Sequence, residues 1–200
     1  MRPGPPTDVP TTELAERLYE RLLVVRCQTG DGIAFGELVR RYAPRLRYYL
    51  RKMFSDPDIE TDDLLQDIWL SVFRDVPRLT DPAAFTAWLY RVARNRALRQ
   101  LRQRPRRSEP LPIPDELPDY EPEDDAFSPD EVERVHVALD RLPGEQREVL
   151  VLRFVQSMSY EDIAAVAGCP VGTVRSRLYY AKRALRQMLD STANAVGPKE

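Results

Sequence analysis

The sequence predicts an all-α protein in which two small helical domains are joined by an extended, acidic, proline-rich linker. Apolar residues recur at steps of three and four residues in both halves of the chain, which is the spacing of one helix face. No stretch sustains the period-two alternation that marks a half-buried strand. Between the two patterned halves, residues 108–129 contain six prolines, eight acids and no base, so this segment cannot form a core and is expected to be extended.

The composition narrows the classes of protein that the chain can belong to. Its 200 residues suit one medium domain or two small ones. With a net charge of −2, a surface for an anionic partner must be built from locally segregated positive charge. No apolar run approaches the roughly 18 residues of a membrane span, and the N-terminus does not resemble a secretory signal, so we expect a cytoplasmic protein. Because Cys27, Cys169 and the single His136 lack ligand-like spacing, we expect no metal, no cofactor and no disulfide.

The N-terminal domain is expected over residues 13–107. The preceding residues 1–12 are rich in proline and have little to bury, which indicates a disordered tail. Helical patterning begins near Glu13, and the last helix of this domain ends at Pro105. Three apolar stripes define the buried helix faces: Phe35, Leu38, Val39, Tyr42, Leu46, Tyr49, Leu50 and Met53; then Leu64, Leu65, Ile68, Trp69, Val72 and Phe73; then Phe85, Trp88, Leu89 and Val92.

The C-terminal domain is expected over residues 130–189, followed by a tail over residues 190–200. One helix should run from Asp130 to Arg141, and a second from Glu145 to about Val155. The inward residues of the second helix are expected to be Val149, Leu150, Leu152 and Phe154. In the next helix, Ser159 and Asp162 have the spacing of an N-cap with a capping-box-like partner.

The last predicted helix carries several cations directly after a turn. Gly168 can adopt the left-handed conformation, and Pro170 suits the start of a helix. The inward face should consist of Val174, Leu178, Ala181 and Leu185, while Arg175, Tyr179, Lys182 and Arg183 occupy the other faces. A charged surface helix that only aids solubility is the simpler interpretation of these cations taken alone. The whole pattern of helix, glycine-containing turn and basic helix is typical of a helix-turn-helix whose second helix enters the major groove of DNA.

A second concentration of positive charge lies in the N-terminal domain. Between residues 82 and 107 there are eight arginines and no acid. Clustered arginines neutralise phosphates and so provide affinity with little sequence information. Tyr90 lies off the apolar stripe beside Arg91 and Arg94, where it could stack on an unpaired base. Binding of this helix to a membrane surface is disfavoured, because its apolar face ends where most of the arginines begin.

Four stretches in this order and spacing resemble one family. They are GDGIAFGELVRRY, DDLLQDIWLSVFR, FTAWLYRVARNRALRQLR, and LPGEQREVLVLRF followed by SYEDIAAVAGCPVGTVRSRL. From about residue 15 to 189 the chain resembles the extracytoplasmic-function (ECF) sigma factors of bacterial RNA polymerase. The resemblance implies that residues 13–107 are sigma region 2, that residues 130–189 are sigma region 4, and that the acidic linker runs through the polymerase interior. It also implies a transcription initiation factor with no catalysis of its own, which recognises the −35 and −10 promoter elements and aids promoter melting.

The resemblance also implies partners and contact residues. The partners would be core RNA polymerase (β and β′ subunits), promoter DNA and an anti-sigma factor. The anti-sigma factor can be membrane-bound and hold the chain at the inner face of the membrane. No small-molecule substrate is implied. Residues implied to contact the polymerase clamp are Asp63, Gln66, Asp67, Leu70 and Arg74. Residues implied to contact the −10 element are Arg78, Tyr90, Arg91, Arg94 and Asn95. Residues implied to contact the −35 element are Thr173, Arg175, Ser176, Arg177, Tyr179 and Arg183.

Three other classes compete with this interpretation. A stand-alone helix-turn-helix regulator would bind DNA without polymerase. An enzyme acting on DNA would need a cluster of carboxylates or histidines, but the dense carboxylates of this chain sit in the proline-rich linker without helical spacing. A scaffold or anti-sigma-like interaction protein would leave both the arginine cluster and the turn motif unexplained.

Overall fold

The computed structural model of the protein describes residues 11–54, 61–102 and 137–194, with side chains over 14–54, 61–102 and 137–189. Every regular element in these ranges is helical, which confirms the predicted all-α class for the described part of the chain. The predicted linker 108–129 lies outside the described residues. Helices extend into both segments that were expected to be tails, because the first begins at Thr11 and the last continues to Asn194.

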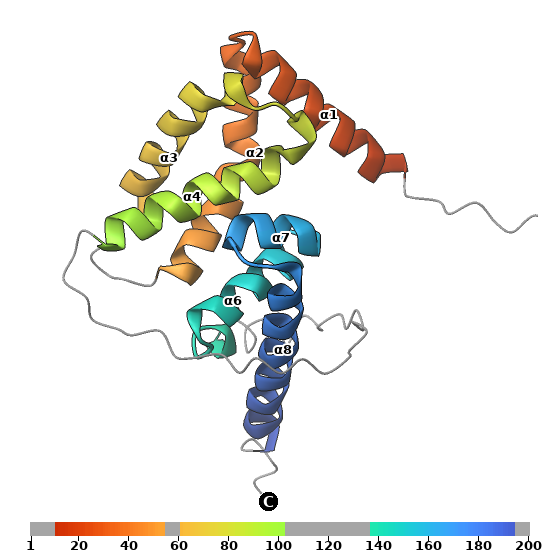
Figure 1. The fold of residues 1–200 in the computed structure, drawn as a ribbon, viewed down its shortest axis with the longest axis vertical. Helices are drawn as coiled ribbons and strands as arrows, with labels where there is room; N and C mark the ends of the chain where they lie inside the picture. The colour runs from red at the N-terminus through yellow and green to blue at the C-terminus, as the bar shows by residue number, and fades with distance from the viewer. Residues whose placement is uncertain (1–10, 55–60, 103–136, 195–200) are drawn as a thin grey trace, which may run out of the picture.

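The N-terminal helices are α1 (Thr11–Gln28), α2 (Gly32–Met53), α3 (Thr61–Asp75) and α4 (Phe85–Arg102), with short 3₁₀ turns η1 (Val76–Arg78) and η2 (Pro82–Ala84) before α4 (Figure 1). Helix α2 begins at an N-cap, Asp31, whose carboxylate accepts hydrogen bonds from the backbone N–H groups of Ile33 and Ala34. These bonds satisfy two donors that the first turn of a helix leaves unpaired. The backbone hydrogen bond from Ala34, followed by the side-chain bond from Arg26, holds the pKa of Asp31 below its usual range.

The predicted apolar stripes form the core of the N-terminal helices, with one exception. Leu38, Leu46 and Tyr49 of α2 are completely buried. Phe73 of α3 was expected to be buried, but its side chain is 55% exposed, so this prediction is wrong. Phe73 lies one residue, or about 100° of rotation, beyond the buried Val72, which places it at the edge of the stripe.

Both tryptophans of the chain belong to the N-terminal helices. At the rim of the core, the ring of Phe35 meets Trp69 edge-on at a centroid distance of 6.0 Å and Phe73 edge-on at 5.1 Å. The second tryptophan, Trp88, is half-buried on α4 beside Phe85, with 6.0 Å between the ring centroids. Such aromatic pairs stabilise a core beyond the area that they bury.

The C-terminal helices are α6 (Gly144–Leu150), a π-helical turn η3 (Val151–Val155), α7 (Tyr160–Ala167) and α8 (Val171–Asn194). The helix predicted from Glu145 to Val155 is present, but its last turn is wider than an α-helix, and the Gln156 N–H donates to the Val151 carbonyl. This widening changes which residues face inward. Phe154 was expected inward but is 36% exposed, so that prediction is wrong, whereas Val149, Leu150 and Leu152 are buried as expected.

The predicted turn between α7 and α8 is confirmed in its details. The Ser159 hydroxyl accepts a hydrogen bond from the Asp162 N–H at 3.0 Å, as expected for an N-cap. Gly168 adopts the left-handed conformation with φ of 67°, where a side chain would be strained. The Pro170 carbonyl accepts from the Val174 N–H, which begins the hydrogen-bond ladder of α8.

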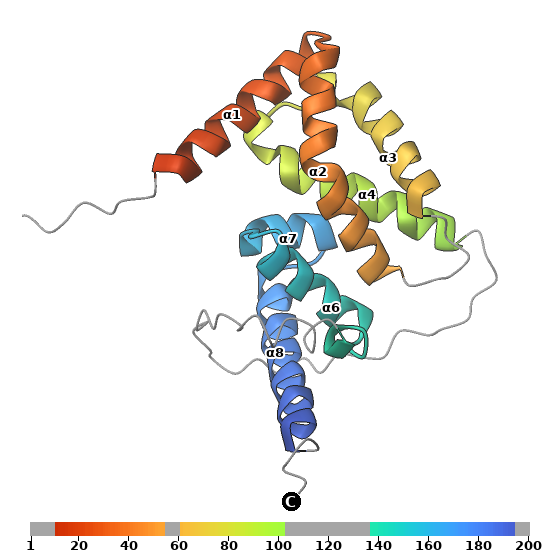
Figure 2. The same cartoon turned by 180° about the vertical axis from the view of Figure 1, so that it is seen from behind.

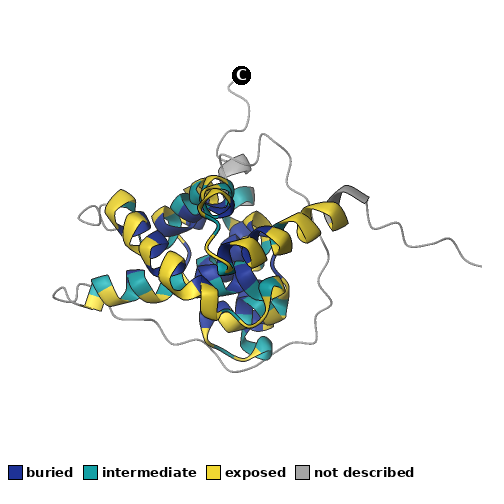
Figure 3. Ribbon diagram, turned by 90° about the horizontal axis from the view of Figure 1, so that it is seen from above, coloured by how far each residue is buried: buried dark blue, intermediate teal, exposed yellow. Residues whose placement is uncertain are grey.

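The N-terminal and C-terminal helices pack against each other. Helix α7 lies against α4, and α6 lies against the C-terminal end of α2, while most of α8 extends away from the N-terminal helices (Figures 1 and 2). Buried residues gather in the centre of the molecule where the two sets meet, and the exposed residues line the outer faces of the helices (Figure 3). The sequence had suggested two bodies separated by a linker and gave no sign of this contact.

Candidate nucleic-acid interface

Helix α8 presents an inner and an outer face, as its sequence predicted. Val174, Leu178, Ala181 and Leu185 are all buried on the inner face. Arg175 and Arg183 are exposed, and Thr173 and Tyr179 are half-buried. An exposed arginine near the N-terminus of such a helix is in the position from which recognition helices reach base edges.

Two of the residues implied to contact the −35 element, Ser176 and Arg177, are buried. Ser176 turns its hydroxyl back to donate a hydrogen bond to the Thr173 carbonyl at 3.0 Å. Arg177 is 9% exposed because its guanidinium forms an ion pair with Glu145 on α6, with 2.5 Å between Nη2 and Oε2. Of the six α8 residues implied to contact the −35 element, these two are turned inward in this structure. Arg177 holds α8 against α6.

On α4, the exposed candidates are Arg91 and Asn95. Tyr90 was expected to be free for base stacking, but its side chain is completely buried, so this expectation is wrong. Its ring meets that of Tyr49 edge-on, with 5.2 Å between centroids, and burial raises the pKa of its hydroxyl. Tyr90 belongs to a second buried face of α4 together with Ala93 and Ala97, which follow it at helical spacing and are also completely buried. Those two alanines are the sequence signal that could have revealed this face.

Arg94 of α4 is held by an acid from the C-terminal helices. Its Nε donates to Oε1 of Glu148 at 2.8 Å, and the Tyr49 hydroxyl donates to the same oxygen at 2.7 Å. Burial alone would lower the pKa of Arg94, but the charge of Glu148, its hydrogen bond and smaller contributions from Tyr49 and Cys169 together outweigh burial, and the pKa is raised. Burial and the same carboxylate raise the pKa of Tyr49 well above its usual range.

The residues expected to contact polymerase lie on one helix and are accessible. Asp63, Gln66, Asp67, Leu70 and Arg74 of α3 are all exposed. Leu70 is 54% exposed although it is apolar, and the neighbouring Phe73 adds to the same exposed surface. The Arg74 Nε donates to the Leu70 carbonyl at 3.2 Å, and Arg78, after the end of α3, forms an ion pair with Asp75 at 3.3 Å.

The described residues hold neither a metal-binding cluster nor a membrane-spanning helix. No group of three or more His, Cys, Asp or Glu side chains in these ranges could hold a metal ion. None of the described helices combines the length and apolar character needed to cross a bilayer. Cys27 is buried and Cys169 half-buried, and burial raises the pKa of both thiols.

Two family descriptions match the chain. Sigma-70 region 2 matches residues 38–107, and Sigma-70, region 4 matches residues 133–185. The RNA polymerase sigma-H factor of Pseudomonas aeruginosa is 35% identical over 85% of this chain and 93% of its own length. The ECF RNA polymerase sigma-E factor of Haemophilus influenzae is 33% identical over 88% of this chain and 98% of its own length.

Solved structures show the same fold. CnrH, in complex with the cytosolic domain of CnrY, has 28% identity and a TM-score of 0.62 over 86% of this chain and 98% of its own. The sigma factor RpoE of Bartonella quintana, in complex with the anti-sigma factor NepR, has 28% identity and a TM-score of 0.60 over 78% of this chain and 96% of its own.

A helix-turn-helix and an arginine-rich helix in one all-α chain define a DNA-binding protein with two different surfaces for the nucleic acid. Together with these relatives, they show that the chain belongs to the ECF sigma factors of the sigma-70 family. It is a transcription initiation factor that directs RNA polymerase to promoters, and the stand-alone regulator is not favoured.

Proposed function

We propose that α8 reads the −35 promoter element, that α4 contacts the −10 element, and that the exposed face of α3 binds the clamp of core RNA polymerase. The observation that carries this assignment is the exposed Arg175 near the N-terminus of α8, where the buried Val174 and Leu178 fix the orientation of the helix. The family supports the roles of the three helices, and the geometry of this chain supports the choice of residues.

On α8, the side chains divide into base-reading and backbone-binding groups. Arg175 can donate two hydrogen bonds to a guanine in the major groove. Thr173 and Tyr179 flank it and contribute further contacts to the DNA. Arg183 lies two turns further along, where it is better placed to neutralise a phosphate. Ser176 and Arg177 act indirectly in the described conformation, by holding the turn and the angle between α8 and α6.

On α4, Arg91 and Asn95 are available to the non-template strand as the structure stands. Arg78 lies in η1, before the N-terminus of α4, and adds a cation to the proposed −10 surface. Arg94 contributes only after it leaves Glu148. Tyr90 supports the helix from within the core, and base capture falls to the segment before Phe85.

On α3, we assign polymerase binding to the surface around Leu70. An apolar side chain that is more than half exposed gains stability when a partner covers it. Leu70→Lys or Gln66→Lys should weaken binding to core polymerase at least tenfold and leave the helix content unchanged. Ser71, which is buried on the same helix, is the control position: its substitution should lower the stability of the fold and affect polymerase binding only through that loss.

Run-off transcription tests the function as a whole. Core polymerase alone should give no specific transcript from a promoter of the chain, and addition of the chain should produce one. Tight promoter binding by the free chain, with no contribution from polymerase, would instead establish a stand-alone regulator.

Regulation by an anti-sigma factor is also proposed for this chain. Two of the similar solved structures are complexes of this kind, one with the cytosolic domain of CnrY and one with NepR. We propose that the chain works in the cytoplasm, without a cofactor or catalysis of its own, and that its anti-sigma factor holds it at the inner face of the membrane. Affinity purification from the native cell should recover a small membrane protein; recovery of polymerase alone under every condition would contradict this.

A further inference from the structure

A polar cleft of about 630 Å³ is lined by residues of α1, α2, η2, the start of α4 and the segment from η3 to α7. Its volume is within the range of small-molecule sites in proteins. The cations that line it are Arg17, Arg21, Arg41, Arg45 and Arg153. Because three carboxylates stand against these five arginines in the described walls, the cleft carries a surplus of two positive charges and favours an anion.

The three carboxylates of the cleft already have partners within the protein. They are paired as follows: Glu16 with Arg41 at 3.2 Å, Glu20 with the Thr86 hydroxyl at 2.9 Å, and Asp162 with the Ser159 hydroxyl at 2.8 Å. Arg21 and Arg45, in contrast, are exposed, and their guanidinium groups form no ion pair or hydrogen bond with any residue that the structure describes. These two cations are therefore available to a ligand.

Gln156 and Ser157, which follow η3 and line the cleft, are both held in unfavourable states. Gln156 is 8% exposed, and its Nε2 has no hydrogen-bond acceptor in the described part of the chain. A buried donor without an acceptor lowers stability, and a phosphate oxygen in the cleft would supply the missing acceptor. Ser157 has a φ of 53°, and non-glycine residues with such strained backbone are concentrated at functional sites.

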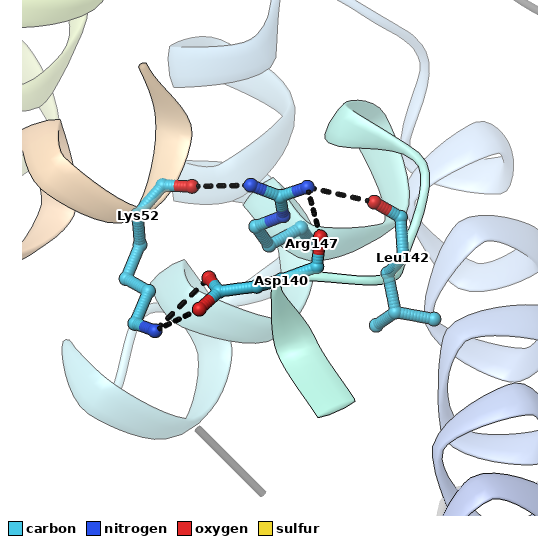
Figure 4. Close-up of polar contacts among 4 residues, drawn as sticks. All are labelled: Lys52, Asp140, Leu142 and Arg147. Carbon is cyan, nitrogen blue, oxygen red and sulfur yellow. Dashed lines mark hydrogen bonds and ion pairs between the residues drawn. The ribbon is translucent and has the colours of Figure 1, made fainter. Parts of the chain in front are cut away.

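A cluster of charges that serves only the fold is arranged differently in this chain. At the end of α2, the Lys52 ammonium lies 2.9 Å from both carboxylate oxygens of Asp140, and the Lys52 carbonyl accepts a hydrogen bond from Arg147 at 2.8 Å (Figure 4). Arg147 also donates to the carbonyls of Asp140 and Leu142. Each cation of that cluster is paired within the protein, whereas two cations of the cleft are not.

The walls of the cleft suit phosphates better than a nucleobase. Tyr42 is the one aromatic residue among the described lining residues, and it is 2% exposed, so its ring is not available to stack on a base. Guanidinium groups match phosphate oxygens with paired, charge-assisted hydrogen bonds. Two available guanidinium groups favour two linked phosphates over a single phosphate.

We propose that the cleft binds a small molecule with two linked phosphates, which is held by Arg21 of α1, Arg45 of α2 and the side-chain amide of Gln156. Neither arginine belongs to the surfaces assigned above to DNA or to polymerase. The site is therefore separate from promoter recognition and gives the sigma factor a place to bind a phosphorylated effector.

Isothermal titration calorimetry of the full-length chain with inorganic pyrophosphate tests the site. The wild type should bind one pyrophosphate, and the double variant Arg21→Ala with Arg45→Ala should bind it at least about tenfold more weakly, because charge-assisted hydrogen bonds are lost. Gln156→Leu removes one neutral donor and should weaken binding about two- to tenfold. Its stability without ligand should be equal or higher, which separates a ligand contact from a structural role.

Adenosine diphosphate distinguishes the two sources of this chemistry. It should bind as tightly as pyrophosphate if the phosphates alone are recognised, and more tightly if the physiological ligand is an organic diphosphate. Arg141→Ala is the matched control for Arg21→Ala, because Arg141 is also exposed but lies outside the cleft. Its affinity for pyrophosphate should be unchanged, and circular dichroism should show the wild-type helix content for every variant.

The proposal is overturned if the wild type shows no saturable binding of pyrophosphate, or if the double variant binds it as tightly as the wild type. An equal loss in Arg141→Ala and Arg21→Ala would overturn it too, since only overall charge would then matter. The same holds if a DNA duplex of random sequence displaces pyrophosphate and needs Arg21 and Arg45 for its own binding. None of these titrations contains polymerase or a promoter, so failure of the site and failure of the proposed function are distinguishable.

Discussion

The two helices assigned to DNA differ in how they hold their arginines. On α8, Arg175 and Arg183 are exposed, and the helix is oriented by a buried stripe on its other side. On α4, Arg94 is tied to Glu148 and Tyr90 is buried against Tyr49. Helix α8 is therefore organised for DNA before any partner arrives, whereas α4 needs a rearrangement. The difference teaches that clustered positive charge in a sequence can locate a DNA-binding surface. It does not show whether the side chains are exposed to DNA or already paired within the protein.

The largest expected effect comes from removing the stripe that orients α8. Leu178→Ala should lower the free energy of unfolding by about 2–5 kcal/mol, because it leaves a cavity in a close-packed core. Leu89→Ala on α4, where the leucine is completely buried, should cost a similar amount. Urea denaturation measures both. A loss below about 1 kcal/mol for Leu178 would mean that the α8 stripe is not packed as described.

The next effect distinguishes sequence-specific contacts to bases from non-specific contacts to phosphates. Arg175→Ala should remove about 1–3 kcal/mol of discrimination at one position of the −35 element, because a bidentate contact to guanine is lost. Transcription from a randomised promoter library measures this preference. Arg91→Ala on α4 is the comparison, and it should weaken all promoters alike. An equal loss for every −35 sequence would show that Arg175 contacts only the DNA backbone.

A smaller effect is expected for the second exposed arginine of α8. Arg183→Ala should weaken promoter binding by the holoenzyme evenly across sequences and lower the slope of log affinity against log salt by about 0.9, the value for one phosphate contact. Salt titrations of the wild type and the variant provide the measurement. An unchanged slope would place Arg183 away from the DNA.

The smallest effect tests the burial of Tyr90. Its hydroxyl is buried and has no hydrogen-bond partner among the residues that the structure describes, so Tyr90→Phe removes an unsatisfied polar group and keeps the ring. We expect the variant to be equally stable or more stable, by up to about 1 kcal/mol, with promoter opening unchanged. Thermal unfolding and run-off transcription check the two parts. A defect in promoter opening with normal stability would show that Tyr90 does contact the DNA.

Local rules account for what the sequence predicted well. The N-cap at Ser159, the left-handed Gly168 and the inward stripe beginning at Val174 depend only on neighbours within a turn or two. The exposed face of α3 was also predictable, because Leu70 lies off the stripe that buries Ile68 and Val72.

The errors arise where a second element or an irregular turn decides the environment. Periodicity assigns one buried face to α4, but Tyr90 is buried by Tyr49 on a neighbouring helix. The π-helical turn changed the direction of Phe154, and no residue in the stretch signals that turn. Nothing in the sequence singles out Glu148, because its partner Tyr49 is 99 positions away.

The placement of the two tryptophans has a practical consequence for spectroscopy. Trp69 and Trp88 are the only tryptophans of the chain, and both belong to the N-terminal helices. Fluorescence excited selectively in tryptophan therefore reports on the N-terminal helices that hold both rings, while far-ultraviolet circular dichroism follows all of the helices. Coincident denaturation curves from the two signals would indicate a single cooperative unit, and separate midpoints would measure how weakly the two halves are coupled.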